Sequence, residues 1–365
     1  MLRFIKTSLC IIAAGICLHA LISCSSIRLN PYYTGFFDYY DDPDTSFYSF
    51  VAANDIIQVM RMIEENIVGV DDADPYGQTA VRLAAQEGHL GMVEYLIMQK
   101  ADLDIPDENG YTALMAAIQK GHLEIASLLV ARGAAINTRD ASGNFPLQIA
   151  ITNEYTEFSI DLLKRGADPN MQDGGGNTPL MISVSYGNTV LINHLLERNC
   201  LLNTADENGE TALHAAIQYK YDEIARQLIE SGADVNRKDR NGITPLMLAV
   251  DFYAQDLVRL MLARGADPDI RNNRGESAFL QAFLIDYVEI IPVLIEKSKN
   301  PDIRDMQGRT LLMRAAYNGY LDTVKSLVNN GADPALKSRE GKTALDYARD
   351  GQYQKVAEFL ANVSK

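Results

Sequence analysis

The feature that most constrains this chain is a glycine that recurs every 33 residues. It stands at nine positions with no insertion between them: Gly77, Gly110, Gly143, Gly176, Gly209, Gly242, Gly275, Gly308 and Gly341. A fixed period of this length indicates one supersecondary unit repeated many times, because such a unit buries its apolar face only against its neighbours. The 365 residues therefore predict a stack of units rather than two or three globular domains.

Each period carries the same residue types at the same spacing. One example reads Asp107-Glu108-Asn109-Gly110-Tyr111-Thr112-Ala113-Leu114, with Ala116-Ala117 and Gly121-His122 after it. The first glycine supplies the positive φ of a tight loop, and the threonine that follows can cap a helix with its hydroxyl. We expect such a cap at Thr79, Thr112, Thr178, Thr211, Thr244, Thr310 and Thr343. Paired alanines and leucines then predict two short helices that pack closely on the next unit.

This pattern is similar to the ankyrin repeat, whose core reads D-x-x-G-x-T-P-L-H-x-A-A. Thr178-Pro179-Leu180 and Thr244-Pro245-Leu246 match three of its four central letters, as does Thr211-Ala212-Leu213-His214. The resemblance implies an all-α solenoid, with a helix-turn-helix and a β-hairpin-like loop in each repeat. We expect about ten repeats over residues 44–365, with degenerate repeats at both ends.

The N-terminus has the pattern of a secretory signal. Arg3 and Lys6 precede an apolar stretch from Leu9 to Leu21, which is too short to span a bilayer comfortably. The stretch ends in Leu21-Ile22-Ser23-Cys24, which resembles the lipobox of bacterial lipoproteins. In that family the signal, here residues 1–23, is removed and the cysteine is acylated, so Cys24 would carry the membrane anchor. The alternative is an ordinary signal peptide that has a cysteine near its end.

Residues 24–43 are interpreted as a tether between the lipid and the repeats. In lipoproteins a serine after the cysteine, here Ser25, usually directs the protein to the outer membrane, so we expect lipid anchoring at a bacterial cell envelope. The tether is unusually rich in aromatic and acidic residues, with six rings between Tyr32 and Tyr40. These rings either pack on the open edge of the first repeat or contact a membrane or partner surface.

Composition and motifs argue against catalysis and nucleic-acid binding. The formal net charge is −15, whereas affinity for a phosphate backbone comes largely from Lys and Arg. Of the four histidines that follow the predicted signal peptide, His89, His122 and His214 occupy positions that are structural in ankyrin repeats, so only His194 is unassigned. No nucleophile–base pair, metal-ligand spacing or phosphate loop can be assembled, and we expect no enzyme activity, metal or cofactor. Cys200 occupies a position that is alanine in other repeats, and a packing role is favoured over a redox role.

A surface for a protein partner is predicted from the end of the first helix of each repeat. Five successive repeats place a large apolar or aromatic side chain there, where the family usually has polar residues: Tyr186, Tyr219, Phe252, Leu284 with Ile285, and Tyr317. Rows of aromatic residues bury much area at low entropic cost and often anchor interfaces. The alternative is that some of these side chains fill gaps left by irregular neighbours.

Charge is also segregated along the loops. Acidic residues are in excess up to Gly209, whereas the loops from Gly242 onward carry a small basic excess. One register of these later loops holds Lys238, Arg271, Arg304 and Lys337. The predicted partner surface therefore combines this basic row with the aromatic stripe in the C-terminal half.

Three functions fit these observations. The favoured one is a monomeric, lipid-anchored adaptor that holds a protein partner at the cell envelope. The second is a dedicated protector or inhibitor of one exported enzyme, and the third is a host-directed effector, which the lipoprotein signal disfavours.

Overall fold

The computed structural model describes residues 43–363. The predicted signal peptide, Cys24 and nearly all of the tether lie outside the described residues. The described chain contains twenty α-helices and isolated β-bridges but no extended strand, which confirms the all-α class. It divides into two compact units, of which the first ends at Gly69 and the second begins at Val70.

The first unit is a pair of helices, α2 (Pro43–Ala52) and α3 (Ile56–Glu64). Helix α2 begins before the register at which the later first helices start. Its first residue is Pro43, and proline is tolerated there because a first helical turn needs no backbone donor. The side chain of Asp55 caps α3 by accepting from the Gln58 backbone N–H at 3.2 Å. Val59 and Met62 of α3 are buried.

The second unit is a stack of nine helix pairs. The first helices are α4 (Ala80–Glu87), α6 (Ala113–Lys120), α8 (Pro146–Thr152), α10 (Pro179–Ser185), α12 (Ala212–Gln218), α14 (Pro245–Asp251), α16 (Ala278–Leu284), α18 (Leu311–Tyr317) and α20 (Ala344–Asp350). The second helices are α5 (Leu90–Met98), α7 (Leu123–Ala131), α9 (Thr156–Lys164), α11 (Thr189–Glu197), α13 (Asp222–Glu230), α15 (Gln255–Ala263), α17 (Ile291–Lys297), α19 (Leu321–Asn329) and α21 (Gln354–Val363).

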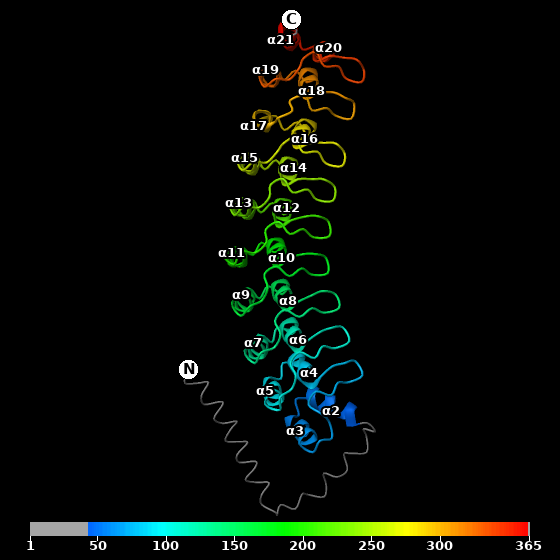
Figure 1. The fold of residues 1–365 in the computed structure, drawn as a ribbon, viewed down its shortest axis with the longest axis vertical. Coiled ribbons are helices and arrows are strands. Elements are labelled where there is room, and N and C mark those ends of the chain that lie inside the picture. Colours follow the sequence, from blue (N-terminus) through cyan, green and yellow to red (C-terminus); the bar gives the residue numbers. More distant parts are fainter. Residues whose placement is uncertain (1–42, 364–365) are drawn as a thin grey trace, which may run out of the picture. The chain divides into compact units, whose positions relative to one another are not determined.

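The helices of this unit form two parallel rows, and the loops project together on one side (Figure 1). Each first helix packs on the first helix of the next repeat, as α4 does on α6 and α18 on α20. Small residues such as Ala84, Ala117 and Ala150 are fully buried in this row and allow the helices to approach closely. The described helices are all too short or too polar to span a bilayer.

The threonine caps are confirmed at six of the seven predicted positions, where the hydroxyl accepts from the third backbone N–H of the first helix. Thr211 is the exception. Its hydroxyl lies 2.9 Å from Nδ1 of His214, and the same ring nitrogen accepts from the Thr211 backbone N–H at 3.2 Å. The Thr211 hydroxyl therefore meets the imidazole instead of the third backbone N–H of α12.

The loop glycines are required by conformation, and most of them by packing as well. All nine have φ between +72° and +83°. A Cβ on Gly110 would also lie 2.9 Å from backbone atoms of Asp140 and Ala141 in the next loop, closer than side chains tolerate. This approach lets the Ala141 N–H donate to the Asn109 carbonyl at 2.8 Å, and most later loops repeat the bond. The loops are therefore joined to each other as well as to their helices.

One repeat departs from the pattern in its second helix. A short 3-10 turn (Val288–Ile290) replaces the first turn, and α17 begins only at Ile291. Pro292 has no N–H to donate to the carbonyl four residues before it, so an α-helical first turn would leave that carbonyl without its bond.

Candidate functional site

The predicted aromatic stripe is exposed, but it follows two registers rather than one. Tyr186, Tyr219 and Phe252 directly follow the last helical residue, whereas Leu284 and Tyr317 are themselves the last residues of α16 and α18. These five side chains are 39–53% exposed, a high fraction for such large apolar groups. Ile285 is only half-buried and contributes less surface.

Neighbouring residues support two of the stripe rings. The ring of Tyr219 stacks on that of Tyr221, with 6.0 Å between centroids. The ammonium of Lys220 lies 5.4 Å from the centroid of the Phe252 ring, in the next repeat, which is a cation–π distance. Part of each ring's conformational entropy is therefore already lost before any partner binds.

Two hollows open between the loops and the first helices. The central hollow has a volume of about 250 Å³ and lies between α10 and α12. Its walls combine carboxylates, amides and Tyr219: Asn177, Met181, Ile182, Ser185, Asp206, Glu210, Thr211, Ala215, Gln218 and Tyr219. In this hollow Gln218 donates to Glu210 Oε1 at 2.7 Å.

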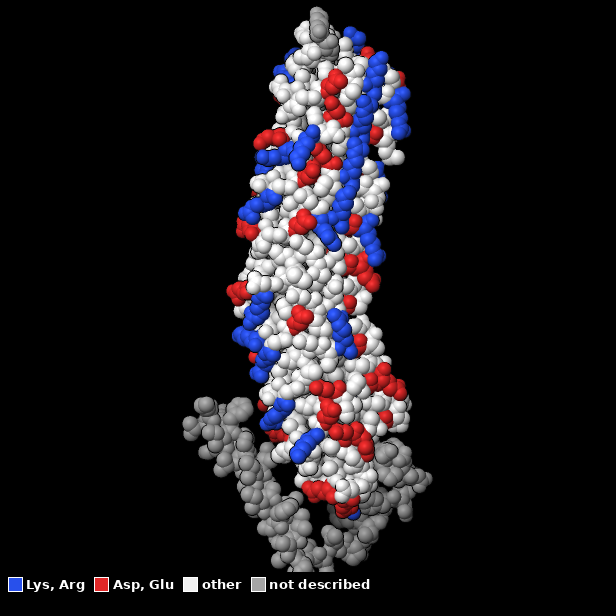
Figure 2. All heavy atoms as spheres, viewed as in Figure 1, with Lys and Arg blue, Asp and Glu red and all other residues white. Residues whose placement is uncertain are grey.

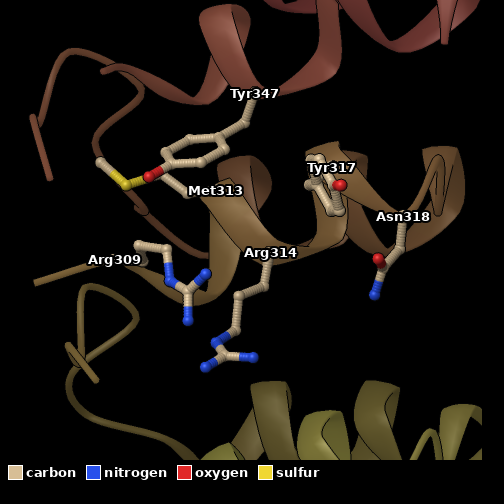
Figure 3. A pocket seen from close by; sticks show the side chains of 6 residues that line it. All are labelled: Arg309, Met313, Arg314, Tyr317, Asn318 and Tyr347. Atoms are coloured by element: carbon tan, nitrogen blue, oxygen red, sulfur yellow. The ribbon is translucent and has the colours of Figure 1, made fainter. Parts of the chain in front are cut away.

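The C-terminal hollow, of about 210 Å³, lies between α18 and α20 (Figure 3). It is lined by Arg309, Met313, Arg314, Tyr317, Asn318 and Tyr347. The two guanidinium groups point the same way, toward the preceding repeat, while Tyr347 reaches in from α20. Tyr219 and Tyr317 are thus the stripe residues that line hollows, and Tyr186, Phe252 and Leu284 lie outside both.

The basic row has a structural role that the sequence did not reveal. Each of its first three side chains donates to the backbone carbonyl at the same register of the next loop. Lys238 reaches the Arg271 carbonyl at 2.9 Å, and Arg304 reaches the Lys337 carbonyl at 2.9 Å. These bonds hold the loops together, so the row is partly occupied in intramolecular contacts. The charges remain at the surface and form a stripe along the C-terminal loops (Figure 2).

Acidic residues of the central repeats lack compensating cations. Among the described residues, no Lys or Arg nitrogen lies within 4 Å of the carboxylates of Glu210, Asp251 or Glu276. The pKa of Asp251 is raised from its ordinary value, first by partial burial and then by the charge of Glu276. The surface between the loops and the first helices, which we call the groove, is therefore negative from Glu210 to Glu276 and becomes positive at Arg309.

A second row of rings, which the sequence analysis missed, closes the turns between helices. Six side chains share the position just before the second helix and lie against the turn of the preceding repeat: His122, Tyr155, Tyr221, Tyr287, Tyr320 and Tyr353. Tyr287 packs on Tyr253 with 4.8 Å between centroids, and the Tyr320 hydroxyl donates to Asp286. The spacing of 33 or 66 residues between successive rings is the signal that could have identified them.

The remaining chemistry-bearing residues have structural surroundings. Cys200 is buried, and burial raises the pKa of its thiol to about 11, so the reactive thiolate is suppressed at neutral pH. His194 lies 3.4 Å from Glu197 on an exposed helix face. His214 is fully buried and contacts the Ile243 carbonyl at 3.3 Å. Within residues 43–363, no group of three or more acidic, His or Cys side chains is placed to hold a metal ion.

Sequence comparison matches the chain to the model for ankyrin repeats (3 copies) over residues 49–140, 83–173, 147–239, 246–338 and 287–365. No curated protein matched the chain. The matches cover nearly all of the repeat array and agree with its helix pairs and stacked loops. The chain therefore belongs to the ankyrin-repeat family, whose repeats indicate a scaffold for protein–protein interaction and are generally non-enzymatic.

Proposed function

We propose that this chain holds a protein partner against the groove side of its C-terminal repeats, with the aromatic stripe as the main contact. The observation that carries the proposal is the exposure of five large apolar side chains at one end of five successive first helices. Soluble proteins seldom expose large apolar groups in a contiguous row unless the row is an interaction surface. The hollows beside Tyr219 and Tyr317 offer sites where partner side chains can be enclosed.

We further propose that the partner is held at a bacterial cell envelope by a lipid on Cys24. The support is the sequence Leu21-Ile22-Ser23-Cys24 after a short apolar stretch. Several acyl chains on one residue give stable anchoring without a transmembrane helix. Under this proposal the repeat array is an adaptor outside the cytoplasm, tethered by residues 24–43.

The binding proposal is tested by pull-down with the chain from residue 24 onward, compared with a Tyr186→Ala, Tyr219→Ala, Phe252→Ala variant. A matched control replaces three apolar residues on or after the second helices that are at least as exposed: Met98→Ala, Val190→Ala and Leu201→Ala. We expect specific partners to be lost with the first variant and retained with the control. Equal recovery by all three proteins would refute the stripe as the contact surface.

The anchor is tested separately, by metabolic labelling with a fatty acid. The full chain should incorporate the label, and a Cys24→Ala chain should not. A labelled Cys24→Ala protein would refute the anchor and leave the binding proposal intact.

A further inference from the structure

The C-terminal hollow carries more positive than negative charge. Asp305 Oδ2 accepts from Arg309 Nε at 2.9 Å and from Arg314 Nη2 at 2.7 Å, so one carboxylate faces two guanidinium groups. Arg314 also donates through Nε to the same oxygen, and Arg309 Nη2 donates to Gln307. Neither Nη1 atom has a partner among the described residues. Two donors and one net positive charge are therefore available at the mouth of the hollow.

The wall beside these arginines is aromatic and fixed in place. The rings of Tyr317 and Tyr347 meet edge to face, with 6.4 Å between centroids. The Tyr347 hydroxyl donates to Ser338 Oγ at 3.2 Å, which orients the ring, and Tyr347 is buried. Tyr317, by contrast, is 53% exposed. The hollow thus places an anion-binding pair next to an apolar surface that has no cover.

We infer that the C-terminal hollow binds the carboxylate of an Asp or Glu side chain in an extended partner segment, and that an apolar neighbour of this acid covers the Tyr317 ring. The inference rests on the proposed function, because it names the partner chemistry for the same groove. A guanidinium presents parallel N–H donors that match a carboxylate. The half-buried position of both arginines strengthens the interaction relative to an exposed ion pair.

The rest of the groove restricts where such an acid can bind. Glu210, Asp251 and Glu276 face the central repeats without a compensating cation, so an acidic residue of the segment is repelled there. The change from negative to positive between Glu276 and Arg309 fixes the position of the acid along the groove. Charge complementarity of this kind contributes to specificity and register more than to total affinity.

The experiment selects partner segments directly. A phage-displayed library of random twelve-residue segments, joined to the coat protein at both ends, is panned on the chain from residue 24 onward. Because the segments have no free terminus, any carboxylate comes from a side chain. We expect enrichment of segments that contain Asp or Glu next to Leu or an aromatic residue. Replacing that acid by its amide should weaken binding at least about tenfold.

Two substitutions test the assignment to the hollow with little risk to the fold. Arg309→Glu places at this register the residue that Glu210 and Glu276 provide in other repeats, and Arg314→Gln reproduces Gln281. Both should remove the preference for an acid, and neither should weaken a segment whose acid is already an amide. Arg274→Glu is the matched control, since it makes the same charge change on an exposed loop tip, where Glu340 stands two periods later. It should leave selection unchanged.

The outcomes separate this inference from the function on which it rests. If the selected segments lack an acid, but bind the unsubstituted chain and not the variant with alanine at Tyr186, Tyr219 and Phe252, only the carboxylate assignment is overturned. An acid preference that persists in Arg309→Glu does the same. If no segment is enriched above beads without protein, both the inference and the proposed groove fail.

Discussion

The buried ion pair between Arg82 and Asp107 allows a quantitative test of how the loops are held. Arg82 Nη2 lies 2.6 Å from Asp107 Oδ2, and the two side chains are 9% and 6% exposed. The other oxygen of Asp107 accepts from the backbone N–H groups of Asn109 and Tyr111 at 2.9 and 2.8 Å. In other repeats the matching aspartate keeps these backbone bonds, but Met or His often replaces the arginine.

Replacing Asp107 alone should therefore cost more stability than replacing Arg82 alone. Asp107→Ala removes two loop bonds and leaves a guanidinium buried without its charge partner, which costs about 3–5 kcal/mol beyond the loop bonds. Arg82→Met removes the cation and leaves the carboxylate with its two N–H donors, as in other repeats. It also removes the buried Arg82 Nε, which has no partner. We expect this change to cost about 1 kcal/mol, the net contribution of a typical hydrogen bond.

The control is Asp173→Ala, because Asp173 accepts the same two backbone bonds, from Gly175 and Asn177, without an ion pair. Urea unfolding gives the free energy of each variant, and amide hydrogen exchange over α4 and α6 shows whether the loss is local, since long repeat arrays need not unfold in one step. An Arg82→Met variant as unstable as Asp107→Ala would contradict the reasoning. So would equal losses in Asp107→Ala and Asp173→Ala.

Three further perturbations test other contacts. Burial lowers the pKa of His214, so the neutral ring stabilises the fold above its unfolded pKa of about 6.5, and this stability is lost as the pH falls below it. Between pH 7 and pH 5, the His214→Met variant should therefore lose less unfolding free energy than the unsubstituted chain, by at most about 1.4 kcal/mol per pH unit. Urea unfolding at the two pH values measures this difference, and an equal loss in both proteins would exclude this role. Arg304→Ala should cost about 1 kcal/mol and expose the Lys337 amide region to exchange, whereas Lys337→Ala, at a side chain that makes no such bond within residues 43–363, should be neutral; equal effects would argue against the loop bonds. Glu154→Gly should raise the free energy of unfolding by about 0.5–1 kcal/mol, because Glu154 has φ of 60° where other repeats use glycine. The urea midpoint should rise accordingly, and a lowered midpoint would contradict this.

Much of the fold could be predicted because it depends on local backbone chemistry. A glycine with positive φ and a threonine cap are readable from single positions, and the fixed period placed every loop correctly. Thr211 is the N-cap residue of α12 as predicted, but its hydroxyl contacts a ring three residues later, and no rule for single positions includes that contact. The irregular start of α17 depends on one proline, Pro292, and was not predicted.

The site was only partly readable. Exposure of the stripe followed from its register. Its division between two registers was also present in the spacing, because the five first helices all end nine residues after their loop glycine. The basic row looked like a partner surface, since sequence shows the charge and not the carbonyl in the next loop that receives it. The C-terminal hollow was missed because it joins Arg309 and Arg314 of one repeat to Tyr347 of the next.

The bonds between successive loops also bear on how such a gene can change length. Each loop offers a donor and an acceptor to the same register of its neighbour, so the loss or duplication of one whole period rejoins a donor to an equivalent carbonyl. A deletion that is not a whole multiple of the repeat leaves both unmatched. Unequal crossing-over between the repeats would then be tolerated in whole units, and each event would change the number of residues between the N-terminus and the positively charged end of the groove.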